Sequence, residues 1–504
     1  MWFLVFCVSL FIVVKLAADL YRPKNFPPGP RGLPLIGNIL DLKRAVKETS
    51  SHGKAFLHFA KKYGSVVALK MGLADPLIVV SGREAVLEML RRHEFDGRPN
   101  GFMFTHRTRG EKRGVMFTDG NAWNDQRRFS VRNLKVFGWH GQSMEEMLLD
   151  DAINLTKIIE RARKDGPIKD MDVHTSFAVI NSLWSIVQGS RYDLENGDPK
   201  IIDTLHLMHQ AVKKSNVTGG ILNQLPFLRY IAPKFTGFEE LNERLDQTWH
   251  FFADEVTRHK QSWKPGENRD LIDVYLQEIE ARKNDPTSSF NGMQLVALLK
   301  DLFAAGIDTT SNSIGFAIAY LTVHREVQDK VQAELDRVIG RENLPSLASK
   351  NSAISSSSRL PYLKATLKEV LRLANIGPTT IPHRAMVDTT LMGYEIKKNY
   401  TLLPMLMSIH MDREHWGDPE VFRPERFIND NGEFVNDPWV IPFGAGRRKC
   451  LGETLAKNSY FLFIVCLLQK FRFELPPGRE IPSMMAVDGF TQSPPQFEIV
   501  VTQR

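Results

Sequence analysis

One of the three cysteines in this chain lies in a segment rich in glycine and cations near the C-terminus. The segment reads PFGAGRRKCLGE, residues 442–453, and places Cys450 directly after Arg447, Arg448 and Lys449. Neighbouring cations lower the pKa of a cysteine, and glycines allow backbone N–H groups to turn toward its sulfur. The segment therefore predicts a thiolate, which would either attack a substrate or bind a metal.

Several chemistries compete for such a thiolate. A phosphate-binding catalytic cysteine needs an arginine that closes the same loop, and CLGETLAK contains none. The segment also lacks the GK[ST] ending of a nucleotide-binding P-loop. A nucleophile activated by a distant histidine stays open, because the chain has 14 histidines. A buried, inert cysteine beside a basic surface is the remaining alternative.

A pair of polar residues lies within an otherwise apolar stretch. The sequence AAGIDTTS places Asp308 and Thr309 there. Polar side chains among apolar ones are costly unless they form hydrogen bonds or take part in chemistry. A threonine hydroxyl in a helix can simply bond to the carbonyl four residues earlier, so this stretch alone leaves both interpretations open.

The elements that must position these residues are mostly helical. Residues Met293 to His324 form the clearest helical stretch, which would span on the order of 48 Å. Residues 65–81 predict two strands about a turn at Ala74 to Pro76. The serine-rich residues 349–359 predict an exposed loop.

The N-terminus predicts attachment to a membrane. Residues 1–20 contain an apolar run and form the predicted anchor, and the proline-rich residues 21–38 form the predicted hinge. Arg22, Lys24 and Arg31 would keep the following catalytic domain, residues 39–504, in the cytosol. A cleaved signal peptide is the alternative, but the start of the apolar run carries no positive side chain.

Composition narrows the remaining choices. The 504 residues are 43% hydrophobic, which allows a core large enough to bury a cofactor. Three cysteines cannot form a disulfide framework, which favours a reducing compartment. The net charge of +7 suits an anionic membrane face or an acidic protein partner, and no nucleic-acid motif is present.

The spacing F-x-x-G-x-R-x-C-x-G decides between the alternatives for Cys450. Phe443, Gly446, Arg448, Cys450 and Gly452 match it in register, and the segment resembles the haem-binding loop of the cytochrome P450 family. The resemblance extends over the chain from the proline-rich residues onward, and its layout is similar to the animal microsomal branch, with details that look insect-like. It implies a mainly α fold with smaller β regions, in which haem b lies between the long helix and the Cys450 loop. Cys450 would be the iron ligand.

The resemblance also assigns structural and haem-binding roles. Glu369 and Arg372 of LKEVLR would join Arg426 of FRPERF in a network that holds the cysteine loop, although a pair at this spacing alone is usually a surface ion pair. The haem propionates would be bound by Trp123, Arg127, Arg448, His383 and Arg98. His383 alone would more simply be a core histidine bonded to the backbone.

The same resemblance predicts catalytic and substrate-binding residues. Thr309 would hold dioxygen and its protons, Asp308 would supply protons from solvent, and Gly306 would let the helix approach the haem. Specificity would come from residues between Arg98 and Trp123, from residues 219–238, and from pocket residues that include Ala305, Thr380 and Phe490. Because these stretches are mainly apolar, a lipophilic small molecule is the expected substrate.

The activity implied is insertion of one atom of dioxygen into that substrate. Electrons would come from NADPH through the flavins of NADPH–cytochrome P450 reductase at the endoplasmic reticulum membrane, with cytochrome b5 as a further donor, because the chain lacks a G-x-G-x-x-G motif. Arg127, Arg128, Arg132 and Lys135 form the predicted docking face. Related enzymes epoxidise juvenile-hormone precursors, hydroxylate steroids or N-hydroxylate aromatic amino acids. A P450-fold isomerase or dehydratase and a non-catalytic haem-binding protein are the alternatives, and Asp308 with Thr309 argues against both.

Overall fold

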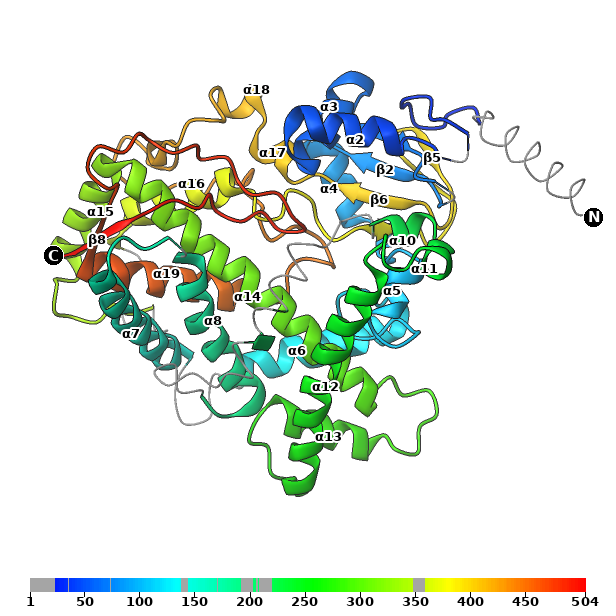
Figure 1. The fold of residues 1–504 in the computed structure, drawn as a ribbon, viewed down its shortest axis with the longest axis horizontal. Helices are drawn as coiled ribbons and strands as arrows, with labels where there is room; N and C mark the ends of the chain where they lie inside the picture. The colour runs from blue at the N-terminus through cyan, green and yellow to red at the C-terminus, as the bar shows by residue number, and fades with distance from the viewer. Residues whose placement is uncertain are drawn as a thin grey trace, which may run out of the picture.

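The computed structural model describes residues 23–136, 144–191, 203–204, 207, 220–347 and 359–504, except positions 35, 73 and 170. Helices dominate these residues, with short strands beside them, so the predicted fold class is confirmed (Figure 1). The helices are α2 (Ile39–Thr49), α3 (His52–Tyr63), α4 (Arg83–Arg91), α5 (Phe102–His106), α6 (Gly120–Val136), α7 (Met144–Ala162), α8 (Met171–Gln188), α10 (Gly220–Gln224), α11 (Leu228–Ile231), α12 (Phe238–Ser262), α13 (Leu271–Ala281), α14 (Gly292–Val323), α15 (Arg325–Val338), α16 (Pro361–Ala374), α17 (Met407–His410), α18 (Arg413–Trp416) and α19 (Glu453–Lys470).

Helix α14 is the predicted long helix, and its observed bounds differ from the predicted ones by one residue at each end. It begins where the side chain of Asn291 accepts a hydrogen bond of 2.9 Å from the backbone N–H of Gln294, a typical N-cap. Most of its residues are buried on every side, as expected of a helix that crosses a core. Figure 1 shows it passing through the middle of the molecule, where both α8 and α12 pack against it.

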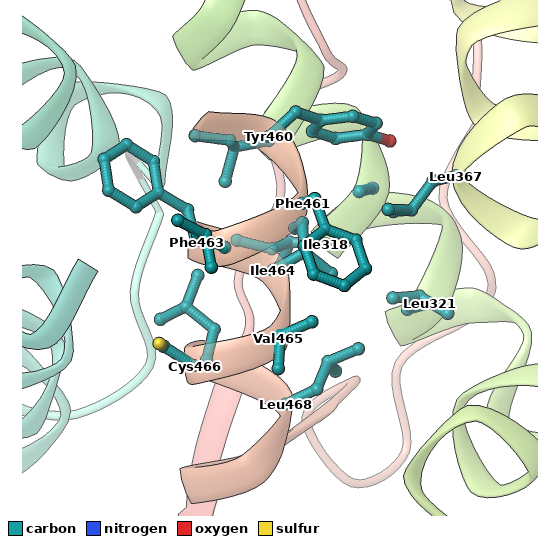
Figure 2. Packing of buried hydrophobic residues seen from close by; sticks show 14 of the residues in the cluster. Ile318, Leu321, Leu367, Tyr460, Phe461, Phe463, Ile464, Val465, Cys466 and Leu468 are labelled. Carbon is teal, nitrogen blue, oxygen red and sulfur yellow. The ribbon is translucent and has the colours of Figure 1, made fainter. Parts of the chain in front are cut away.

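Helix α19 forms the other part of the core that positions the site. All residues from Ser459 to Gln469 are buried, and they pack against α14 and α16. Figure 2 shows Phe461 and Ile464 of α19 beside Ile318 of α14. Because α19 begins three residues after Cys450, its burial fixes the C-terminal side of the cysteine loop.

The strands form one four-stranded sheet and two two-stranded sheets. They are β1 (Val66–Leu69), β2 (Leu77–Val80), β3 (His383–Arg384), β4 (Thr389–Leu391), β5 (Tyr394–Ile396), β6 (Thr401–Pro404), β7 (Phe471–Glu474) and β8 (Val500–Gln503). The predicted antiparallel pair is β1 and β2, and β6 joins β2 in parallel and β3 antiparallel. The sequence did not predict β3 to β8, because runs of two to four residues are too short to show an alternating pattern.

The described part of the predicted hinge is tied to the sheet. The backbone N–H of Ala68 donates to the carbonyl of Pro28 at 2.8 Å, and that of Asn38 donates to Lys70 at 2.6 Å. A Cβ added to Gly29 would lie 2.1 Å from the carbonyl oxygen of Ala68, so only glycine permits this approach. Pro28 and Asn38 therefore each hydrogen-bond to the segment that contains β1, and the hinge itself stays a prediction.

Two predicted segments cannot be compared with the structure. The predicted anchor, residues 1–20, lies outside the described residues, as does the serine-rich loop apart from Arg359. Among the residues that the structure does describe, no helix combines the length and the apolar character needed to cross a membrane.

A buried ionic cluster joins α12 to α13. His259 bonds through Nε2 to Asp270 at 3.0 Å and through Nδ1 to the carbonyl of Glu255 at 3.0 Å. Asp270 is also the N-cap of α13, where it accepts from the backbone N–H of Asp273. Burial acts to lower the pKa of His259, but the hydrogen bonds with Asp270 and Glu255 outweigh it and raise this pKa to about 10.

Candidate active site

The Cys450 loop is a tight turn that packs against the end of α4. The backbone N–H of Cys450 donates to the carbonyl of Phe443 at 2.9 Å, and Gly444 and Gly446 both have φ of +71°. A Cβ added to Gly446 would lie 1.8 Å from the carbonyl oxygen of Leu90. The glycine at 446 is therefore required both by the backbone angle and by the contact with α4.

The predicted lowering of the Cys450 pKa is wrong, although the nearby cations act in the predicted direction. Burial raises the pKa of the Cys450 thiol, and Glu453 adds to this, while the Gly452 N–H, Arg127 and Lys449 oppose it. Ion pairs limit the effect of these cations on the pKa of Cys450. Lys449 pairs with Glu453 at 2.6 Å. Arg447 likewise pairs with Asp96 at 2.9 Å. A cation bound to its own carboxylate does little for a neighbouring thiolate, so metal coordination rather than this cation group would have to keep the sulfur deprotonated.

One cavity of about 830 Å³ brings most of the predicted site residues together. It lies between α14 and the cysteine loop, and further walls come from α6, α12 and the segment before β3. The predicted residues that line it are Arg98, Trp123, Arg127, Ala305, Thr309, Thr380, His383, Arg448, Cys450 and Phe490. Asp308 and the three members of the predicted network are not among its lining residues.

Two buried polar atoms at this cavity fit the carboxylates of a haem. Nε2 of His383 and Nη1 of Arg448 have no hydrogen-bond partner among the described residues. Arg448 is otherwise bonded, through Nε to the carbonyl of Asp96 and through Nη2 to that of Thr118, both at 2.9 Å. Burial lowers the pKa of Arg448 to about 8, and burial together with the charge of Arg98 lowers that of His383 well below its usual value. Nη1 of Arg448 is thus a buried donor on a cationic group, which a propionate would satisfy. His383 donates through Nδ1 to the carbonyl of Phe95 at 2.7 Å, so its Nε2 donates to a carboxylate only when the ring is protonated, a state that a neighbouring propionate would favour.

Trp123 and Arg127 lie one helical turn apart on α6, beside this pair. The guanidinium carbon of Arg448 lies 3.7 Å from the ring centroid of Trp123, a stacked cation–π arrangement. Arg127 donates through Nη2 to the carbonyl of Lys449 at 2.7 Å, so it holds the backbone next to Cys450. Both residues therefore contact the cysteine loop directly as well as lining the cavity.

Arg98 is buried and bonded to backbone. Its Nε donates to the carbonyl of Met116 at 3.0 Å, and its Nη1 donates to the carbonyls of Ile381 and Pro382, both at 3.1 Å. Burial lowers its pKa to about 9. These bonds join the segment before α6 to the segment before β3, so Arg98 braces the cavity wall in addition to any role toward a propionate.

Glu369, Arg372 and Arg426 meet in a buried network. Arg372 donates to both oxygens of Glu369, at 2.7 and 2.8 Å, and neither side chain is exposed. Arg426, in the 3₁₀ helix Pro424–Phe427, donates through Nε to the same carboxylate at 3.2 Å. The alternative of an exposed ion pair on one helix face is thus excluded by burial.

The route from this network to the cysteine loop passes through His410, which the sequence did not single out. Arg372 donates to the carbonyl of His410 at 2.8 Å, and Nε2 of His410 accepts from the backbone N–H of Ile441 at 3.0 Å. Burial lowers the pKa of His410 to about 3, so it stays neutral and able to accept. Ile441 in turn accepts from the backbone N–H of Gly444 within the loop at 2.9 Å.

Asp308 and Thr309 occupy different sides of α14. Thr309 lines the cavity, and its hydroxyl donates to the carbonyl of Ala305 at 2.7 Å, the helix-internal bond that the sequence had left open. Asp308 is buried on the other side, where its carboxylate accepts from the hydroxyl of Thr491 and from the amide of Asn312 at 3.3 Å. In this arrangement Asp308 faces the segment that follows Phe490 rather than the open cavity.

Gly306 lines the cavity, and its role in the approach of α14 to the haem stays a prediction. A Cβ added there would lie 2.5 Å from Cδ1 of Leu183, so the space beside this glycine is filled by α8. The glycine therefore serves the close packing of α14 on α8.

The three predicted substrate-contacting residues come from separate parts of the chain. Ala305 belongs to α14, Thr380 lies against Gly444 of the cysteine loop, and Phe490 precedes the residue that bonds Asp308. The predicted stretch 219–238 reaches the cavity through Gly220, Leu222, Thr236 and Gly237. Gly219 lies outside the described residues.

A long central helix across a cavity from a cysteine loop, with cationic side chains placed for carboxylates, defines a haem-thiolate oxygenase. The family model for cytochrome P450 matches residues 27–501, so the chain belongs to the cytochrome P450 family and is a P450 monooxygenase, which implies haem and its iron. It is 33% identical to farnesoate epoxidase of Bombyx mori, over 99% of this chain and 98% of that protein. It is 35% identical to probable cytochrome P450 305a1 of Drosophila melanogaster, over 98% and 97% of the two chains, and 35% identical to cytochrome P450 2J2 of Homo sapiens, over 96% and 93%.

Proposed function

We propose that this enzyme oxidises a lipophilic terpenoid or related small molecule with electrons from NADPH–cytochrome P450 reductase. One observation carries the proposal: Cys450, the unpartnered atoms of His383 and Arg448, and the Thr309 face of α14 all line the same cavity. When bound, the haem supplies the iron at which dioxygen is reduced and cleaved.

The residues of this chain have distinct tasks in that reaction. Cys450 would ligate the iron and Arg448 and His383 would bind the propionates, while the ring of Trp123 stacks against the guanidinium of Arg448. Thr309 turns its hydroxyl from Ala305 toward the cavity to deliver a proton, a rotation about one side-chain bond. Asp308 takes up protons and passes them on from its site beside Thr491.

The proposed docking face for the reductase lies on α6. Arg128 and Arg132 are exposed there, and Arg447 and Lys449 of the cysteine loop are about half exposed nearby, whereas the side chain of Lys135 lies outside the described residues. We expect Arg128→Glu to raise the apparent reductase KM at low salt. Lys54→Glu, an exposed lysine on α3, is the matched control. Equal KM values for the two variants would argue against this face.

Attachment to the endoplasmic reticulum membrane is supported by an apolar surface. Tyr230, Ile231 and Phe235 are exposed, Phe235 to 85%, in the segment between α10 and α12. The nearby residues Leu33, Ile36 and Leu40 are also exposed. A Cβ on Gly72 would lie 3.4 Å from the Gln224 carbonyl oxygen and 3.6 Å from Cδ1 of Ile39, so α10 lies beside the start of α2. A surface of this kind suits contact with lipid.

The similarity to a farnesoate epoxidase favours terpenoid epoxidation in a hormone-related pathway among the three predicted reactions. The test is expression with reductase and product identification from farnesoate, a steroid and an aromatic amino acid. Epoxide from farnesoate supports the proposal. If only the steroid or the amino acid were oxidised, the proposed terpenoid substrate would be wrong. Conversion without NADPH would indicate an isomerase instead of a monooxygenase.

A further inference from the structure

Lys300 is a buried amino group at the cavity to which the proposed reaction assigns no task, and burial lowers its pKa to about 7. It lies on α14, its side chain is only 6% exposed, and it lines the cavity. Its only hydrogen bond within the described residues is a long one, 3.5 Å from Nζ to the carbonyl of Arg107. The ring of Trp249 on α12 lies 5.4 Å away. An ammonium group has three donors, so Lys300 keeps donors for a partner that these residues do not provide.

Arg107 is a second cation with an unpartnered donor at the same place. Its Nη2 donates to Asp301 at 2.6 Å, but its buried Nη1 has no hydrogen-bond partner among the described residues. Arg107 also lines the cavity. Two cationic side chains from different elements thus hold unused donors at one cavity wall.

Asp301 does not neutralise both cations. One of its oxygens accepts from Arg107, and the other accepts from the backbone N–H groups of Val115 and Met116, both at 2.8 Å. It forms no ion pair with Lys300 among the described residues. Lys300, Arg107 and Asp301 together carry one net positive charge when all are ionised, which matches one monoanion.

We propose that Lys300 and Arg107 bind a carboxylate carried by the substrate. This rests on the proposed function, because it names the substrate class of the same cavity: a lipophilic acid rather than its ester or alcohol. The carboxylate accepts from Nζ of Lys300 and Nη1 of Arg107, and its apolar remainder extends through the cavity toward the cysteine loop. A guanidinium and an ammonium group at one wall of a largely apolar pocket are the few polar groups that fix the orientation of such a ligand.

The position of the pair also fixes where oxidation takes place. Lys300 and Thr309 are nine residues apart on α14, which is about 13 Å along the helix axis. A substrate held by its carboxylate at Lys300 therefore presents a distant carbon to the iron. Oxidation is expected far from the acid group.

The test measures binding by equilibrium dialysis with the full-length, haem-loaded protein. The probes are dodecanoic, farnesoic and 3-phenylpropanoic acids, each paired with its methyl ester. We expect at least one acid to bind about ten- to a hundredfold more tightly than its ester, which is the effect of a hydrogen-bonded charge. Lys300→Met and Arg107→Met should remove this preference, and Lys300→Arg should keep most of it. Lys260→Met, at an exposed position on α12 away from the cavity, should leave it unchanged.

Equal binding of acid and ester in every pair, or a preference that survives in Lys300→Met and Arg107→Met, overturns the proposal. Failure of the proposed function gives a different result, because the unmodified protein would then form no product with NADPH and reductase, whereas the binding preference is measured without either. The carbon monoxide difference band of a thiolate-bound haem is a separate control. The same band, recorded for each variant, shows that the cavity has kept its fold.

Discussion

Three glycines of the cysteine loop separate two reasons for having glycine there: a positive φ and a lack of space for a Cβ. They are Gly444, Gly446 and Gly452. Gly444 and Gly446 have the same φ of +71°, but a Cβ on Gly444 would meet only Cγ2 of Thr380 at 3.8 Å, an ordinary contact. A Cβ on Gly446 would meet the Leu90 carbonyl oxygen at 1.8 Å. Gly452 has φ of −93° and nothing within 4 Å of the added atom.

Alanine at each position should therefore destabilise the protein by different amounts. Gly452→Ala should change the free energy of unfolding by less than about 0.5 kcal/mol. Gly444→Ala should cost about 1–2 kcal/mol, the usual penalty of a left-handed backbone for a residue with a Cβ. Gly446→Ala should cost the same plus about 2 kcal/mol or more, because a carbonyl oxygen in the backbone of α4 cannot move aside as a side chain can.

The assay is urea unfolding followed by tryptophan fluorescence, with the carbon monoxide difference band as a second readout. Gly446→Ala should lose most of the band, because displacing this turn moves Cys450. Gly444→Ala should keep a reduced band, and Gly452→Ala a normal one. If Gly446→Ala were as stable as Gly444→Ala, the contact with Leu90 would not constrain the loop and the reasoning would be refuted.

Three further predictions concern charges and protons. Glu369→Gln should lower the free energy of unfolding by roughly 3–5 kcal/mol, measured in urea, because it leaves Arg372 charged and buried; a loss under about 1 kcal/mol would contradict this. The pKa of His259 is raised to about 10, so its contribution to stability is complete below the unfolded pKa near 6.5 and is lost as pH rises toward 10. The melting temperatures of the wild type and His259→Gln should accordingly converge with rising pH. A difference between them that grows with pH would contradict this prediction. Thr491→Val removes a hydrogen bond to Asp308 and should reduce product formed per NADPH consumed while leaving the carbon monoxide band unchanged, whereas unaltered coupling would remove Thr491 from proton delivery.

The sequence alone was sufficient where the signal is local. The cysteine loop is recognisable because its function depends on residues ten positions apart at most, and turns with a positive φ demand glycine wherever they occur. The long helix was predicted to within one residue at each end because its apolar run is long. The pair β1 and β2 was found for the same reason, whereas strands of two to four residues carried no pattern of their own.

What only the tertiary structure decided is the electrostatic state of the site. The cations before Cys450 predicted a lowered pKa, but Arg447 and Lys449 are paired with acidic residues and burial dominates, so the pKa rises. The contact of Asp308 with Thr491 joins residues 183 positions apart. The unpartnered donors of Lys300 and Arg107 likewise appear only when the chain is folded. The sequence identifies the charged groups, but burial and distant partners determine the pKa of each one. Burial and distant partners arise only when the whole chain packs.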